Sequence, residues 1–246
     1  LLPLFPVPEP RVHDEFAYLL AADTLVHQRL VNPRHPSWVH FESMHILTTP
    51  VYASAFPIAQ AAVLALGQVV FGHPWAGIWL SAGLMSAAIC WMLQGWAPAP
   101  WALLGAWLAV LRYGVSSYWM NSYWGGCLAA TGGALVLGAL PRILRQPVWR
   151  NTVPMGLGLA LLANTRPVEG AFFGLIVGVA LLARILRIRR LSPVTILRHV
   201  LLPLAVILAA TAAGMGYYFA RVTGKPWLPP YVWYRTTLTK APHFLW

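Results

Sequence analysis

The chain contains one long apolar stretch near its C-terminal end, which reads VLLPLAVILAATAAGMGYYFA from residue 200 to residue 220. No Asp, Glu, Lys or Arg interrupts it. A helix needs about 20 predominantly apolar residues to cross the hydrocarbon core of a bilayer. The stretch therefore predicts a membrane-spanning helix.

Further apolar segments of similar character occur along most of the chain, separated by Pro, Gly and basic residues. With the final segment extended to 198–220, they predict an all-α fold, a polytopic transmembrane helical bundle of about six or seven spans. The other predicted segments are 56–72, 75–94, 101–117, 123–140, 153–166 and 167–186.

The composition agrees with this fold class. Of the 246 residues, 59% are hydrophobic and only 9% are Asp, Glu, Lys or Arg, and the mean hydropathy is +0.63. Soluble domains carry about 25% charged residues, so these charges are too few to cover a water-exposed surface. The composition excludes an ordinary soluble protein.

The charge balance is strongly basic, with a net charge of +11, and 15 of the 17 basic residues are Arg. Many of them lie in two segments, 141–150 and 184–199, beside apolar runs. Basic loops next to membrane helices remain in the cytoplasm and attract anionic lipid headgroups. We therefore expect both segments to be cytoplasmic loops, and no nucleic-acid partner.

This orientation places residues 164–170 and the tail after Arg221 on the external side. Residues 1–55 are predicted to form an external loop, 56–220 the transmembrane domain, and 221–246 an external tail. An odd number of crossings is needed between residue 55 and residue 141, yet four apolar segments lie there. Either one of the four is short or re-entrant, or the N-terminal loop is not external. The segment we favour as the irregular one is 101–117, which is short for a span and contains Arg112.

The first 55 residues differ from the rest because they hold five of the six acidic residues. Within them, His13 to Leu30 predicts an amphipathic helix on the membrane surface, with Asp14 and Glu15 in its first turn. Acidic residues there can act as a general base or simply stabilise a helix N-terminus, and both readings stay open. Its predicted apolar face consists of Phe16, Leu19, Leu20, Val26 and Leu30.

Four motifs carry a resemblance to a known family. They are HDEFAY at residues 13–18, LVNP at 30–33, YWMNSYWGG at 118–126 and TRP at 165–167. The sequence resembles the bacterial members of the GT-C membrane glycosyltransferases, the group related to protein O-mannosyltransferases and aminoarabinose transferases.

The resemblance implies an inverting glycosyltransferase of the bacterial inner membrane, with membrane lipids around it. Such enzymes move a sugar from a polyprenyl-phosphate carrier to a hydroxyl of a glycan, lipid or protein acceptor on the external face. It also implies that Asp14 acts as the base and that Glu15 is its neighbour. No cofactor is certain, and a divalent metal ion is left open.

Release of polyprenyl phosphate needs cations that stabilise the developing negative charge. Arg166 suits this role, and Arg235 and Lys225 in the tail are alternatives. Arg166 is followed by Glu169, so a simple ion pair explains it equally well. The tail cations are also explained by side chains that extend toward the interface.

Aromatic residues near Asn121 offer candidate sugar contacts. Tyr123 and Trp124 can stack on a sugar ring while Asn121 binds its hydroxyls, and we add Tyr18 to this group. The aromatic belt of a membrane interface is the alternative explanation.

Two further patterns are explained without chemistry. The spacing of His40, Glu42 and His45 places them poorly on one helical face, so a metal site is not favoured there. Gly132-Gly133 is expected to permit close helix packing rather than to bind phosphate.

Two other functions remain open. A polytopic transporter or lipid flippase fits the composition, although no internal repeat is visible. A non-catalytic family member that only binds lipid-linked sugar is the other. Family members often place Lys or His beside a Pro-Pro pair, whereas residues 52–60 contain no basic residue and one Pro.

Overall fold

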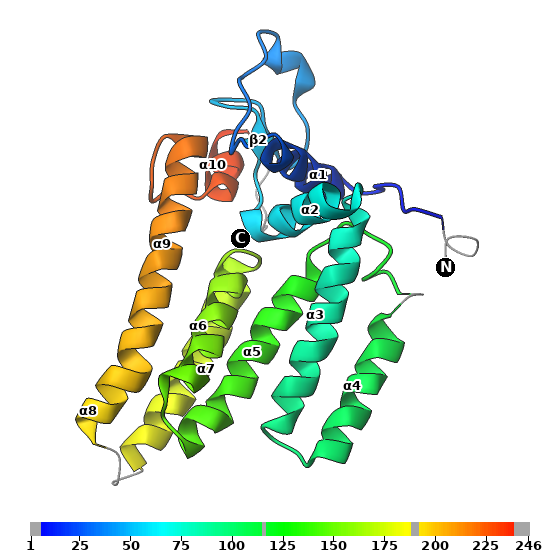
Figure 1. Ribbon diagram of the computed structural model, residues 1–246. Helices are drawn as coiled ribbons and strands as arrows, with labels where there is room; N and C mark the ends of the chain where they lie inside the picture. Colours follow the sequence, from blue (N-terminus) through cyan, green and yellow to red (C-terminus); the bar gives the residue numbers. More distant parts are fainter. Residues whose placement is uncertain (1–5, 115–116, 188–191, 239–246) are drawn as a thin grey trace, which may run out of the picture. The chain divides into compact units, whose positions relative to one another are not determined.

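The computed structural model describes residues 6–114, 117–187 and 192–238, most of which are helical (Figure 1). The chain forms two compact units. The N-terminal unit runs to Trp79 and also contains Asn121–Trp124 and the chain from Ala213 onward. The helical unit contains Leu80–Met120 and Gly125–Ala212.

The helical unit is built from helices that lie side by side (Figure 1). A core of buried aliphatic side chains is centred on Val136, Ile143 and Val200. Its elements are α3 (Trp75–Gln94) from Leu80, α4 (Ala99–Tyr113), α5 (Gly126–Arg145), α6 (Trp149–Ala163), α7 (Pro167–Arg187), α8 (Pro193–Ile196), a π-helical turn (Leu197–Leu201) and α9 (Leu202–Thr223) up to Ala212.

Four helical stretches in the described residues are long and apolar enough to cross a membrane: Trp75–Gln94, Gly126–Arg145, Pro167–Ile185 and Pro193–Thr223. This supports a helical membrane protein. Helices α4 and α6 have 15 residues each. At 1.5 Å per residue each is about 22 Å long, shorter than a hydrocarbon core of about 30 Å.

Helices α5 and α6 pack closely through glycine. A Cβ on Gly132 would lie 2.9 Å from the carbonyl oxygen of Gly158, and a Cβ on Gly158 would lie 2.6 Å from that of Gly132. Small residues let two helix backbones approach in this way. Gly132 therefore has the expected packing role, whereas a Cβ on Gly133 would meet open space.

The first predicted basic loop is shorter than expected because α5 continues through Arg145. Arg142 donates hydrogen bonds to the carbonyl oxygens of Gly138 (2.6 Å) and Trp91 (2.7 Å), and its guanidinium lies 4.0 Å from the centre of the Trp91 ring. Arg145 donates to the carbonyl oxygen of Gly95 at 2.9 Å. These partners let the guanidinium groups stay on a helix that the sequence predicted to end at residue 140.

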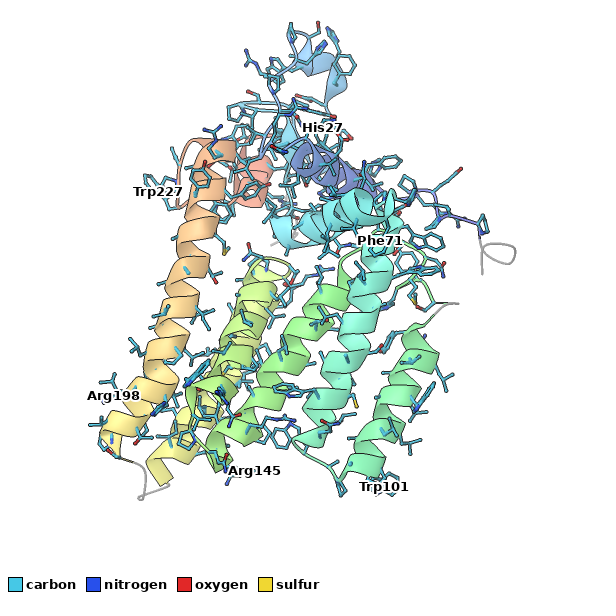
Figure 2. The ribbon with its side chains drawn as sticks, in the orientation of Figure 1. His27, Phe71, Trp101, Arg145, Arg198 and Trp227 are labelled. Atoms are coloured by element: carbon cyan, nitrogen blue, oxygen red, sulfur yellow. The ribbon has the colours of Figure 1, made fainter. Side chains whose placement is uncertain are left out.

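Basic residues gather at one end of the helical unit. Arg145, in the last turn of α5, and Arg198, at the start of the final helical stretch, lie toward the same end, while the turn between α6 and α7 lies at the other (Figures 1 and 2). The two basic segments thus share one side of the bundle, as the sequence predicted. Part of the second segment, residues 188–191, lies outside the described residues.

The N-terminal unit combines helices with a very small sheet. Strand β1 pairs antiparallel with β2, with Ile46 opposite Ser54 and Leu47 opposite Ala53. Its elements are α1 (His13–Val26), a 3-10 turn (Trp38–Phe41), β1 (Ile46–Leu47), β2 (Ala53–Ser54), α2 (Ile58–Phe71), the first turn of α3, the last turns of α9 and α10 (Pro230–Thr237).

Helix α1 differs from the predicted amphipathic helix in length, and only part of its predicted apolar face is packed. It ends at Val26 rather than Leu30, and Phe16 is exposed. Tyr18 and Ala22 pack in a cluster with Leu64 of α2, and Leu19 and Val26 of the predicted apolar face pack against this cluster.

Helix α2, like α4 and α6, is shorter than the hydrocarbon core. Its 14 residues extend about 21 Å, and it packs against α1. The sequence predicted a short or re-entrant segment at 101–117, whose described part belongs to the 15-residue α4 in the helical unit. Between residues 55 and 141, the described helices that are long and apolar enough to cross a membrane are α3 and α5. The number of crossings in this part of the chain therefore stays a prediction.

Close contact between α2 and α3 depends on Gly77. A Cβ at this position would overlap the backbone carbonyl oxygen of Val63. We expect Gly77→Ala to destabilise the protein by about 1–3 kcal/mol, because the two helices must move apart. Thermal unfolding in detergent measures this. Gly83→Ala in the same helix meets no atom within 4 Å and is the control; equal melting temperatures for the two variants would contradict the assignment.

Candidate functional site

The carboxylate of Glu15 joins two segments of the N-terminal unit. Oε2 accepts the backbone N–H groups of Arg11 (2.7 Å) and Val12 (3.2 Å), and Oε1 accepts the N–H of Tyr123 (2.8 Å). The residue is only 2% exposed. Both oxygens are occupied by backbone donors, so Glu15 positions the start of α1 against residues 121–124.

Tyr123, which donates its N–H to Glu15, is held by two further hydrogen bonds. Its hydroxyl donates to the carbonyl oxygen of Pro8 at 2.8 Å, and Nε2 of Gln60 donates to the carbonyl oxygen of Tyr123 at 2.9 Å. Burial raises the pKa of the Tyr123 phenol, and the Glu15 charge raises it further. At 3% exposure its ring offers no open face for a sugar.

Asp14, the neighbour of Glu15, has a different environment. Its Oδ1 lies 3.2 Å from Nε2 of His45, and its side chain is 23% exposed. No hydrogen bond of Oδ2 occurs in the part of the chain that the structure describes. One oxygen is thus oriented by an imidazole, while the carboxylate keeps access to solvent.

His45 reaches Asp14 through an unusual backbone conformation. Its φ is +62°, in the left-handed region, and its carbonyl oxygen accepts the N–H of Ala55 at 2.9 Å. Left-handed backbone costs free energy in residues other than Gly, and such strain often occurs at functional sites. The pairing of β1 with β2 holds this conformation in place.

Aromatic rings surround the His45 imidazole. The centre of its ring lies 4.9 Å from that of Phe56, 5.7 Å from that of Tyr234 and 6.4 Å from that of Tyr231. Tyr18 stacks on Phe56 at 4.8 Å. The dyad of Asp14 and His45 therefore lies beside three rings from α10 and the segment before α2, and Tyr18 of α1 joins this group through Phe56.

Helix α10 closes one side of the dyad. Tyr231 and Tyr234 are three residues apart, so they share one helix face. A hollow of about 190 Å³ lies against Tyr234 and contains the Glu42 side chain in its wall. Arg235, next along the helix, is partly buried, whereas Lys225 is exposed in the preceding loop.

Arg166 belongs to the helical unit. Its guanidinium lies 3.9 Å from the Glu169 carboxylate, and both side chains are exposed. Exposed ion pairs of this kind add little stability. The pair fits the simple explanation that the sequence left open, and it leaves the guanidinium accessible.

The structure places most of the predicted residues in the N-terminal unit. Asp14, Glu15 and Tyr18 share α1, while Asn121 and Trp124 flank the Glu15–Tyr123 contact. Tyr18 and Trp124 contribute to the buried cluster. Of the predicted acids, only Asp14 therefore combines a side-chain partner with solvent access.

His45 is the residue that sequence reasoning placed in the wrong context. It was considered only with His40 and Glu42 as a metal site, but its partner is Asp14. Within the described residues, no three His, Cys, Asp or Glu side chains gather in a way that could hold a metal ion. The only available signal was the presence of His45 in the same acid-rich segment.

Comparisons with models of protein families, with curated proteins and with solved structures found no match to this chain.

Proposed function

We propose that the protein is a membrane glycosyltransferase that transfers a sugar from a polyprenyl-phosphate carrier to an acceptor hydroxyl, with Asp14 as the base. It works on the external face of a bacterial inner membrane. The observation that carries the proposal is the Asp14–His45 dyad, a partly exposed carboxylate oriented by an imidazole and flanked by aromatic rings.

The dyad supports proton removal from an acceptor. His45 fixes Oδ1, so Oδ2 is the oxygen that meets the acceptor hydroxyl. As the acceptor oxygen bonds to the anomeric carbon, its proton passes to Asp14, and the bond from that carbon to the phosphate oxygen breaks. Polyprenyl phosphate leaves with the bonding electrons, and attack from the opposite face inverts the anomeric centre.

The surrounding groups have supporting roles in this proposal. Aromatic rings such as Tyr231 provide flat faces for a sugar. Arg235, one residue after Tyr234 on α10, is the candidate cation of the N-terminal unit for the leaving phosphate, with Lys225 as the alternative. The four described helical stretches that are long and apolar enough to cross a membrane support a membrane protein, and a polyprenyl carrier resides in the membrane.

A transfer assay tests the proposal. The full chain, purified in detergent, is incubated with polyprenyl-phosphate-linked sugars labelled in the sugar and with a membrane extract as the source of acceptor. Movement of label to a new product, with release of polyprenyl phosphate, is the expected result. Labelled substrate crossing proteoliposomes without a covalent product indicates a transporter, and donor binding without turnover indicates a non-catalytic protein; either outcome would overturn the proposal.

A further inference from the structure

The segment between α1 and β2 contains a second pocket, apart from the dyad. Two parts of this segment are joined by backbone hydrogen bonds, because Asn32 and Tyr52 exchange two of them at 3.0 Å. Strand β1 lies between these two residues in the sequence and pairs with β2, which directly follows Tyr52. The side chain of Asn32 also donates to the Thr24 hydroxyl at 2.7 Å. The segment is thus tied to α1 and to the sheet, so its pocket has a fixed frame.

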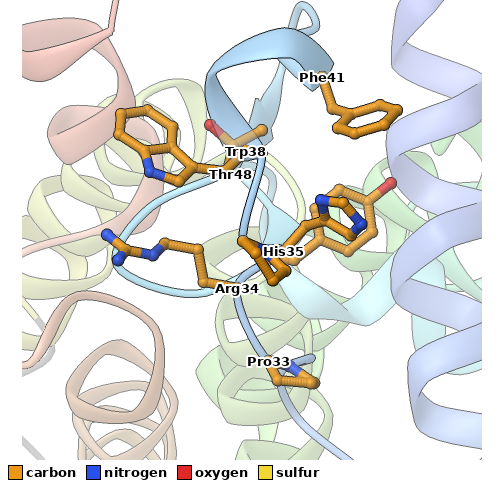
Figure 3. A pocket seen from close by; sticks show the side chains of 8 residues that line it. Pro33, Arg34, His35, Trp38, Phe41 and Thr48 are labelled. Atoms are coloured by element: carbon orange, nitrogen blue, oxygen red, sulfur yellow. The ribbon is translucent and has the colours of Figure 1, made fainter.

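The pocket has a volume of about 400 Å³ and is lined mainly by aromatic rings and prolines, with Arg34 as its cation. Figure 3 shows Arg34 below Trp38 and His35 below Phe41. The Arg34 guanidinium carbon lies 5.7 Å from the centre of the Trp38 ring, and the His35 and Phe41 rings meet edge to face at 4.9 Å. No carboxylate lines the pocket, so its electrostatics favour an anion.

Thr48 adds a polar group to the pocket wall. The residue is only 2% exposed, and its hydroxyl has no hydrogen-bond partner among the residues that the structure describes. Buried hydroxyls are normally hydrogen-bonded, so one without a partner calls for an explanation. A ligand that carries hydroxyl groups supplies the missing partner.

We propose that this pocket binds a saccharide with an anionic group. The sugar ring stacks on Trp38 or Phe41, its phosphate or carboxylate pairs with Arg34, and a ring hydroxyl reaches Thr48. The volume suits a small ligand such as a monosaccharide or disaccharide. Assignment of this saccharide as the acceptor rests on the proposed function; the binding itself does not.

Calorimetric titration of the full chain in detergent tests the binding. The probes are glucose 6-phosphate, methyl glucuronide, neutral methyl glucoside and inorganic phosphate. Both anionic sugars are expected to bind about tenfold more tightly than methyl glucoside, because an Arg–anion hydrogen bond is charge-assisted. Preference for glucose 6-phosphate identifies phosphate as the anionic group, and preference for methyl glucuronide identifies carboxylate.

Variants locate the ligand. Arg34→Gln should remove the preference for anionic sugars, whereas Trp38→Ala should weaken all three sugars about tenfold. Thr48→Val, which keeps the side-chain shape, should weaken binding a fewfold while Thr48→Ser does not. Arg29→Gln and Trp227→Ala change exposed residues outside the pocket and should leave binding unchanged.

Three results would overturn the proposal: no sugar binding, inorganic phosphate binding as tightly as glucose 6-phosphate, or equal losses in the pocket and control variants. Transfer activity is measured separately. If anionic sugars bind but no sugar is transferred, the glycosyltransferase proposal fails and the saccharide site stands. If transfer occurs and these sugars do not bind, the site fails and the enzyme stands.

Discussion

Asp14→Asn is expected to lower the rate of sugar transfer by about 10²–10⁴-fold, the usual contribution of general acid–base catalysis. Asn has the same shape as Asp, and its carbonyl oxygen can still accept a hydrogen bond from Nε2 of His45, 3.2 Å away in the wild type. The substitution therefore preserves the geometry and removes the group that takes the acceptor proton. Binding of donor and acceptor should change little.

Initial rates of transfer, with donor and acceptor varied in turn, separate the two effects. Asp23→Asn is the matched control, because it makes the same chemical change on the same helix. The Asp23 side chain is exposed and contacts only His27, at 3.5 Å, among the described residues. A wild-type rate in Asp14→Asn, or an equal loss in Asp23→Asn, would remove Asp14 from the proposed reaction.

Helix length and apolar composition made the main fold predictable. The stretch at 200–220 and the segments at 75–94 and 167–186 all correspond to long helices. Arg142 shows where local reasoning failed. The sequence predicted that the helix ends before Arg142, because an Arg is unfavourable in an apolar run. The structure gives Arg142 the carbonyl oxygen of Trp91, 51 residues away, as a partner, and the local pattern does not contain this contact.

Local patterns also located part of the candidate site. Acidic residues are rare enough in this chain that Asp14 and Glu15 stood out. The sequence pattern alone, however, could not show that their environments differ. Their different environments come from distant residues, since Glu15 meets Tyr123 and Asp14 meets His45. Contacts between positions so far apart in sequence have no periodicity, so only the fold could separate a positioning acid from an accessible one.

Glu15→Ala is expected to lower the free energy of unfolding by about 3 kcal/mol or more. Glu15 accepts three backbone N–H groups, and its removal leaves the N–H of Tyr123 without its acceptor in a buried position. Hydrogen bonds to a charged group contribute about 1.5–3 kcal/mol each, and an unsatisfied buried donor costs about 1–3 kcal/mol. Thermal unfolding in detergent should show a melting temperature lower by several degrees.

Glu9→Ala provides the control, because Glu9 is exposed on the segment that leads into α1 and should change stability by no more than about 0.5 kcal/mol. Glu15→Gln is a sharper test. Its amide keeps one acceptor oxygen but turns an NH₂ group toward backbone donors, so it should lose most of the stability that Glu15→Ala loses. A wild-type melting temperature for Glu15→Gln would show that the stability does not depend on the Glu15 carboxylate. Loss of stability in Glu15→Gln, together with wild-type stability and lost transfer in Asp14→Asn, would assign folding to one acid and chemistry to its neighbour.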